Sequence, residues 1–223
     1  MRLTAVGTSG SFPGASNAAS CYLLTWESGE REWRVVLDLD AVVLSHLHPD
    51  HCLDMTGLFV RRMYDPAVFH PPTDPAAAPT IATEPLDVWG PVGTQDRLTR
   101  AHHTDPGLSP DGDRSQPTDL GDSFAFRTLR DGTPFTIGGA LFEPVLVRHP
   151  VECYALRITA PDGGVLVYSG DTDECDGLDR AAADADLFLC EAAFEEERDL
   201  TRGVHLTGLR AGLTAARAAV SRL

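Results

Sequence analysis

A short apolar run that leads into a cluster of histidines constrains this chain more than any other feature. The run Ala41-Val-Val-Leu44 is followed at once by Ser45-His-Leu-His-Pro-Asp-His51. A near-continuous apolar run of this length is typical of a strand that is covered on both faces. The cluster therefore begins where a buried strand ends, and an irregular turn there allows alternate side chains to converge on one point.

Imidazole nitrogens and carboxylate oxygens are the donor atoms that bind Zn²⁺ and similar divalent ions. From the chain's own residue frequencies, the pattern H-x-H-x-D-H is expected by chance roughly once in a thousand such chains. A chance polar loop is therefore a poor explanation of the segment. The segment instead predicts a metal site that includes His46, His48, Asp50 and His51.

The remaining sequence alternates strand-like and helix-like segments, as in a layered α/β domain. Helical periodicity covers 55–64, 93–102 and 207–222, and Thr207 is a suitable N-cap for the last helix. The predicted strands are Arg2–Val6, Cys21–Trp26, Trp33–Leu39, Ala41–Ser45, Leu86–Trp89, Ser123–Thr128, Leu141–Arg148, Tyr154–Thr159, Val165–Ser169 and Leu187–Cys190. Residues 66–85 and 104–119, rich in Pro, Gly and polar residues, are predicted surface loops. The 223 residues fit one domain, 1–223.

The charge of the chain limits its partners. All 18 basic residues are Arg, and with 33 acidic residues they give a net charge of −15. Such a surface repels a phosphate backbone, which disfavours broad nucleic-acid binding. A small phosphate substrate held by local cations is compatible with it.

The sequence also carries signals of its compartment. No apolar run reaches the roughly 18–20 residues of a membrane span, and the N-terminus lacks the pattern of a signal peptide. The five cysteines are scattered and form no C-x-x-C pair, as in proteins that keep reduced thiols. We therefore expect a cytoplasmic protein with no membrane anchor.

Three further polar residues stand near the ends of predicted elements. His149 closes one strand, Asp171 follows another after a Ser-Gly turn, and His205 precedes the last helix. Taken singly, each is more often structural, because strand-end histidines and turn aspartates are common. Since α/β scaffolds assemble their sites from the ends of several strands, the ordered set favours one shared site with the first cluster.

With these motifs the sequence resembles the metallo-β-lactamase superfamily, whose fold is a four-layer αββα sandwich with a metal site at one edge of its two sheets. It is most similar to the ribonuclease Z-like branch, and especially to bacterial cyclic-nucleotide phosphodiesterase-like members. The resemblance extends over essentially the whole chain, from Gly7–Pro13 to the last helix. It is carried by Ser45–His51, Arg148–Pro150, Tyr168–Thr172 and His205–Thr207.

The resemblance implies a site with two divalent metal ions, with zinc favoured over manganese and iron. The implied ligands are His46, His48 and His149 for the first ion, Asp50 and His51 for the second, and Asp171 as the bridge between them. The implied catalytic residues are Asp50, which orients or deprotonates the nucleophilic water, and His205, which contacts the phosphate and protonates the leaving oxygen.

The resemblance further implies a phosphodiester hydrolase, although the same scaffold hosts several chemistries. A cyclic nucleotide of the cAMP type is favoured over tRNA, because the chain is acidic and shows no long basic arm between Asp171 and His205. The main alternative is a ribonuclease Z-type enzyme that processes tRNA 3′ ends. A mono-iron persulfide dioxygenase and a metal-poor binding protein are further alternatives.

The oligomeric state is left open by the sequence. Members of this branch form homodimers, and the helix at 55–64 offers Leu58, Phe59 and Met63 as a candidate contact patch. Packing of these residues into the core explains them equally well.

Two features depart from the family pattern. Arg34–Asp38 runs almost directly into Asp40–Leu44, whereas relatives carry a turn and a helix between these strands. Adjacent parallel strands need a crossover of roughly a dozen residues, so we expect a segment to be missing near 38–41. The chain also ends at Leu223, before the strand whose Thr-His pair supplies the family's last metal ligand. We therefore expect a further segment after 223, or a weak second metal position.

Overall fold

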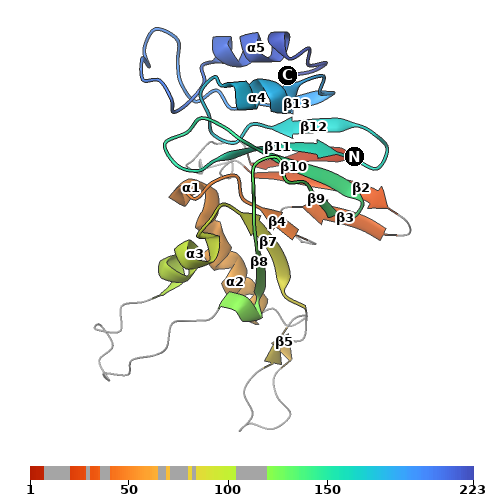
Figure 1. Cartoon of the computed structure of the whole chain (residues 1–223). Helices are drawn as coiled ribbons and strands as arrows, with labels where there is room; N and C mark the ends of the chain where they lie inside the picture. The colour runs from red at the N-terminus through yellow and green to blue at the C-terminus, as the bar shows by residue number, and fades with distance from the viewer. Residues whose placement is uncertain are drawn as a thin grey trace.

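The structure is a computed structural model that describes residues 1–7, 21–28, 31–35, 41–64, 69–70, 80–81, 84–103 and 120–223. Two β-sheets lie face to face, and helices cover the outer face of each sheet (Figure 1). The architecture is the four-layer αββα sandwich that the family resemblance implies, and it confirms the predicted layered α/β domain. Among the described residues, no helix is long and apolar enough to cross a membrane.

The first sheet has six strands, in the order β1-β2-β3-β4-β7-β8. Their bounds are Arg2–Gly7, Cys21–Ser28, Arg31–Val35, Ala41–Val43, Leu86–Gly90 and Phe124–Thr128. Strands β1 to β3 pair antiparallel, and the pairs from β3 to β8 are parallel. The helices α1, α2 and α3 lie on its outer side (Figure 1), at Pro49–Cys52, Asp54–Tyr64 and Thr94–His102.

The second sheet has five strands, in the order β13-β12-β11-β10-β9. Their bounds are Leu187–Leu189, Val165–Tyr168, Tyr154–Thr159, Ala140–Leu146 and Phe135–Ile137. All pairs are antiparallel except β12 with β13. Its outer face is covered by α4 and α5, at Asp176–Ala182 and Gly208–Arg217 (Figure 1). A small separate ladder joins β5, Phe69–His70, to β6, Thr80–Ile81, and a 3₁₀ turn covers Leu120–Asp122.

Three apolar clusters fill the three interfaces between these four layers. The cluster between the sheets includes Leu24, Trp26, Phe142, Leu156 and Leu166. The cluster beneath α2 and α3 includes Phe59, Val88, Leu98, Leu120 and Phe124. The cluster beneath α4 and α5 includes Val167, Leu178, Phe188, Leu206 and Ala211. Burial on this scale stabilises the fold by about 25 cal/mol for each Å² of apolar surface removed from water.

Strand β4 shows why its sequence is continuously apolar. Ala41 belongs to the cluster between the sheets, whereas Val42 belongs to the cluster beneath the helices. Successive side chains of a strand point to opposite faces, so a strand with a layer on each side buries both sets. The prediction of a strand covered on both faces is confirmed, although the strand ends at Val43 rather than Ser45.

The last helix is shorter than predicted. Thr207 caps it as expected, since its hydroxyl accepts a hydrogen bond from the Arg210 backbone N–H at 3.2 Å. The helix ends at Arg217 instead of 222 because Ala219 has a left-handed backbone, with φ of 54°. The tail then bonds beside β13, where Phe188 donates its backbone N–H to the Arg222 carbonyl at 2.8 Å. Tertiary hydrogen bonds here override the helix propensity of an Ala-rich segment.

Several sequence expectations lie partly or wholly outside the described residues. They include the missing segment near 38–41, since residues 36–40 are not described, and the loops at 104–119 and most of 66–85. Strands β3 and β4 pair in parallel at Val35 and Ala41. In the candidate dimer patch on α2, Phe59 is buried in a core cluster, and Leu58 and Met63 are partly buried against it.

Candidate metal centre

The histidine cluster follows β4 at the edge where the two sheets meet. Leu44 still pairs with the neighbouring strand by donating its backbone N–H to the Trp89 carbonyl at 2.8 Å. The Ser45 carbonyl then accepts the Tyr154 N–H of β11 at 3.0 Å, which ties the turn to the second sheet. Helix α1 begins directly after His48, because a proline occupies its first position. The turn is therefore held from both sheets.

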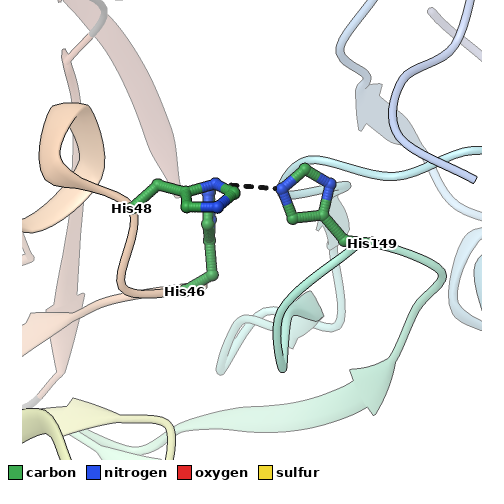
Figure 2. A group of neighbouring side chains, drawn as sticks. All are labelled: His46, His48 and His149. Atoms are coloured by element: carbon green, nitrogen blue, oxygen red, sulfur yellow. Dashed lines mark hydrogen bonds between the residues drawn. The ribbon is translucent and has the colours of Figure 1, made fainter.

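The first metal-binding group consists of His46, His48 and His149. One ring nitrogen of each lies within 4.8 Å of the others. Figure 2 shows His149 approaching His48 from a different segment, with its Nε2 3.1 Å from His48 Nδ1. The other nitrogen of His149, Nδ1, lies 2.9 Å from the Val204 carbonyl and donates to it when it carries the ring proton. That bond directs Nε2 towards the group, as in metal-ligating histidines.

The chemistry of this group fits a metal ion. His46 is fully buried, and among the described residues its Nε2 has no hydrogen-bond partner. Burial is the main reason that its pKa falls to about 3, and neighbouring imidazoles add to the effect. Burial also lowers the pKa of His149. Both rings are therefore neutral near pH 7, which is the form that binds a metal.

A second group consists of His46, His51 and Asp171. The Asp171 Oδ2 lies 3.3 Å from His51 Nε2 and 3.7 Å from His46 Nε2. Burial opposes ionisation of Asp171, but the hydrogen bond with His51 and the nearby imidazoles outweigh it and lower the pKa to about 2. Asp171 is therefore an ionised carboxylate between two imidazoles, and it is the residue for which the family resemblance implies a bridging role.

Asp50 lies beside these groups rather than inside one. Its Oδ2 is 3.5 Å from His51 Nε2, and its side chain is 31% exposed. The family resemblance implies that Asp50 is both a ligand and the residue that orients or deprotonates water. Its position at the exposed rim of the second group is compatible with either role.

Asp171 reaches this position because Gly170 precedes it. Gly170 has φ of 59°, and a Cβ there would lie 2.8 Å from the Tyr154 carbonyl oxygen. Only glycine avoids both the left-handed penalty and the clash. The sharp turn after β12 therefore depends on this residue.

Replacing Gly170 with Ala is expected to lower the free energy of unfolding by about 1–3 kcal/mol, since it forces a non-glycine residue into a strained backbone. Urea denaturation monitored by circular dichroism measures the change. Gly57→Ala is the control, because a Cβ at this position in helix α2 meets no atom within 4 Å. Equal stability of the two variants would contradict the prediction.

A third group joins His205 to a residue that the sequence analysis did not identify. His205 Nδ1 lies 3.0 Å from Glu191 Oε1 and 3.9 Å from Asp171 Oδ2. Glu191 Oε1 also accepts the Thr172 N–H at 2.8 Å, and its Oε2 accepts the Ala193 N–H at 3.0 Å. The hydrogen bond with Glu191 is the largest cause of the raised pKa of His205. Glu191 directly follows a predicted strand, so the strand-end reasoning used for Asp171 would have found it.

The structure thus brings together all the predicted site residues, from four separate segments of the chain. They are His46, His48, Asp50, His51, His149, Asp171 and His205, to which the structure adds Glu191. Their geometry can hold divalent metal ions and places an ion-paired histidine beside them.

In comparisons with known proteins, the family described as 'Beta-lactamase superfamily domain' matches residues 24–223 of this chain. The uncharacterized protein ML1173 of Mycobacterium leprae is 40% identical over 239 residues, covering 100% of this chain and 76% of that protein. The probable metallo-hydrolase YhfI of Bacillus subtilis is 31% identical over 245 residues, covering 100% and 85%. The crystal structure of YhfI, described as a metallo-beta-lactamase fold protein, matches with a TM-score of 0.71 at 24% identity, over 98% of this chain and 82% of that one. The human zinc phosphodiesterase ELAC protein 2 is 28% identical over 181 residues, which cover 80% of this chain and 21% of that protein.

Proposed function

Because this chain belongs to the beta-lactamase superfamily, we propose that it is a binuclear metal-dependent phosphodiester hydrolase that acts on a small cyclic nucleotide of the cAMP type. One observation carries the proposal. Asp171 is shared by a group that can hold a metal ion and by the group that contains the His205–Glu191 pair. A phosphodiester held there would contact the metal-binding side chains and a proton-donating histidine at once.

The site residues have different roles in the proposed hydrolysis. Bound divalent ions, with zinc favoured, supply Lewis-acid stabilisation of the phosphate and lower the pKa of water. His46 and His149 present neutral nitrogens beside His48, and Asp171 presents a negative charge at the adjoining group. Asp50, at the exposed rim, is placed to orient the attacking water or accept its proton.

His205 serves as the acid for the leaving oxygen. Its Nδ1 is engaged by Glu191, which leaves Nε2 as the ring atom that can give a proton. The raised pKa of His205 favours the protonated ring near neutral pH. A histidine is suited to protonate a departing alkoxide in this pH range.

The surroundings of His205 support a small substrate over a long polyanion. The Phe194 ring packs against the His205 ring at a centroid distance of 5.0 Å. The residues that follow Phe194 include the exposed acidic side chains Glu195, Glu196 and Glu197. With the net charge of −15, these groups repel the many phosphates of an RNA more strongly than the single negative charge of a cyclic phosphodiester.

A ribonuclease Z-type activity is the second candidate. The similarity to ELAC protein 2, whose name describes a zinc phosphodiesterase, favours phosphodiester chemistry without selecting the substrate. The separating experiment measures bound metal in the purified chain and its rates on cyclic AMP and on a precursor tRNA. Cyclic AMP turnover that disappears with a chelator and returns with Zn²⁺ or Mn²⁺ supports the proposal. Rapid tRNA cleavage without cyclic AMP turnover overturns it, and a single bound iron with persulfide oxidation does so as well.

Replacing Glu191 with Gln is expected to shift the pH dependence of turnover. A raised pKa keeps His205 protonated to higher pH, so activity is lost as pH rises through that pKa. Without the carboxylate, the pKa of His205 falls and the alkaline limb of the kcat profile moves to lower pH. Profiles of kcat against pH for both proteins, at saturating metal, measure the shift. Glu195→Gln is the control, since Glu195 is exposed and pairs with Arg198. An unmoved alkaline limb in Glu191→Gln would refute this role.

A further inference from the structure

Within the part of the chain that the structure describes, one buried carboxylate stands outside the proposed mechanism. Asp173 is fully buried and lies two residues after Asp171. Its Oδ2 accepts hydrogen bonds from the Gly203 backbone N–H and from Arg202 Nε, both at 2.7 Å. Its Oδ1 accepts the Glu174 backbone N–H at 2.8 Å and a hydrogen bond from the Arg210 guanidinium. Four donors thus surround a side chain that takes no part in the three groups of site residues.

These hydrogen bonds join segments that are far apart in the sequence. The backbone of Asp173 donates its N–H to the Arg148 carbonyl at 2.9 Å, one residue before His149. Its carboxylate holds Arg202 and Gly203, three and two residues before His205, and Arg210 on the first turn of α5. Asp173 therefore links the loops that carry His149, Asp171 and His205.

The Arg202–Gly203 turn, which the Asp173 carboxylate holds, has an unfavourable backbone conformation. Gly203 has φ of 82°, and a Cβ at this position would lie 3.2 Å from Arg148 Nε. Free chains seldom keep such a turn in one conformation, so contacts around it must select it. The two hydrogen bonds from Arg202 and Gly203 to Asp173 are contacts of this kind.

Val204 and His205, which follow this turn, position two side chains of the site. The Val204 carbonyl binds His149 Nδ1 at 2.9 Å, and His205 Nδ1 binds Glu191 at 3.0 Å. A shift of the turn at 202–203 would therefore move a predicted metal ligand and the predicted acid together. Proton transfer needs heavy-atom distances of about 2.6–3.2 Å, so a small shift of the His205 ring is costly.

We propose that Asp173 is a positioning residue, which acts by fixing the Arg202–Gly203 turn and, through it, the ring of His205 and the carbonyl that orients His149. The effect on turnover rests on the proposed function. The effect on the conformation of the turn does not.

The first test replaces Asp173 with Asn, which keeps the size of the side chain but turns one acceptor into a donor that faces donors. At saturating metal we expect kcat to fall about 10²-fold, as for a misplacement of about 1 Å, with KM changed less than about 3-fold. Asp179→Asn is the matched control, because Asp179 pairs with Arg217 at 3.0 Å across α4 and α5, away from the site loops. A kcat for Asp173→Asn equal to that of the control contradicts the proposal.

A double-mutant cycle separates positioning from general damage to the fold. If Asp173 acts through His205, Asp173→Asn should cost less in a His205→Ala background than it costs alone, because one of the two groups that it positions is gone and only the effect through His149 remains. If Asp173→Asn only lowered the fraction of folded, active protein, kcat would fall by the full 10²-fold in the His205→Ala background as well. The full decrease in the double variant therefore contradicts the proposal.

Hydrogen–deuterium exchange provides a readout that needs no substrate. In Asp173→Asn we expect amides in 199–207 to exchange at least about 10-fold faster, with β11 and β12 unchanged. Arg202→Gln is the second variant for the case that Asp173→Asn does not fold, since Arg202 is 53% exposed. It should accelerate exchange in the same segment by a smaller factor. Unchanged exchange in 199–207 contradicts the proposal, whereas faster exchange in a protein without phosphodiesterase activity supports it and overturns only the proposed function.

Discussion

Replacing His205 with Ala is expected to lower kcat on a cyclic phosphodiester by about 10²–10⁴-fold, the range typical of a lost general acid. The reason is the geometry of the ring. His205 Nδ1 is held by Glu191 at 3.0 Å, so the ring is fixed in place with Nε2 available for proton transfer. The carboxylate of Asp171, a predicted metal ligand, lies 3.9 Å from Nδ1, beyond hydrogen-bond distance.

Metal analysis must accompany this kinetic measurement. We expect the metal content of His205→Ala to equal that of the unaltered protein, because His46, His48 and His149 form their group without it. His103→Ala is the control, since His103 follows helix α3, outside the three groups. Loss of metal from His205→Ala would show that His205 is a ligand and not the acid. A substrate with a nitrophenolate leaving group provides a second check. Nitrophenolate departs without being protonated, so His205→Ala should lower kcat less on this substrate.

Replacing Asp171 with Asn is expected to lower kcat/KM by about 10³-fold or more, equivalent to about 4 kcal/mol of transition-state stabilisation. Asp171 Oδ2 lies within 3.9 Å of ring nitrogens of His46, His51 and His205, so one carboxylate contacts both a group that can hold metal and the predicted acid. The neutral amide retains the shape but supplies no negative charge to offset two cations.

Metal titration by calorimetry tests the origin of this loss. We expect the unaltered protein to bind two ions, and Asp171→Asn to bind fewer or to bind them at least about 10-fold more weakly. Asp186→Asn is the matched control, because the Asp186 carboxylate accepts the Val165 N–H at the opposite end of β12. Two ions bound as tightly as before in Asp171→Asn would rule out the bridging role.

The sequence predicts the central part of the fold because burial leaves a visible pattern. The run Ala41–Leu44 is apolar throughout since its residues alternate between two cores, and the strand ends that follow such runs converge on one edge. This is why His46, His149 and Asp171, which span more than one hundred residues of the chain, could be assigned to one site from the sequence.

Other features leave no comparable pattern. Helix α4 is short, and Gly177 weakens its helical signal, yet Leu178 and Ala181 are buried against the second sheet. The bonds of Asp173 join residues 30 and 37 positions apart through polar side chains of ordinary types. Contacts of this kind exist only once the sheets have packed, so no local periodicity encodes them.

The location of the histidine turn between the two sheets has a consequence for the integrity of the whole molecule. His46 and His48 belong to the half of the chain that forms the first sheet, while His149 and Asp171 belong to the half that forms the second. An ion bound by both halves cross-links them without a covalent bond. Free metal at 100 times the dissociation constant would add about 2.7 kcal/mol to the free energy of unfolding. The supply of free metal would then determine how much of this protein is folded as well as how fast it works.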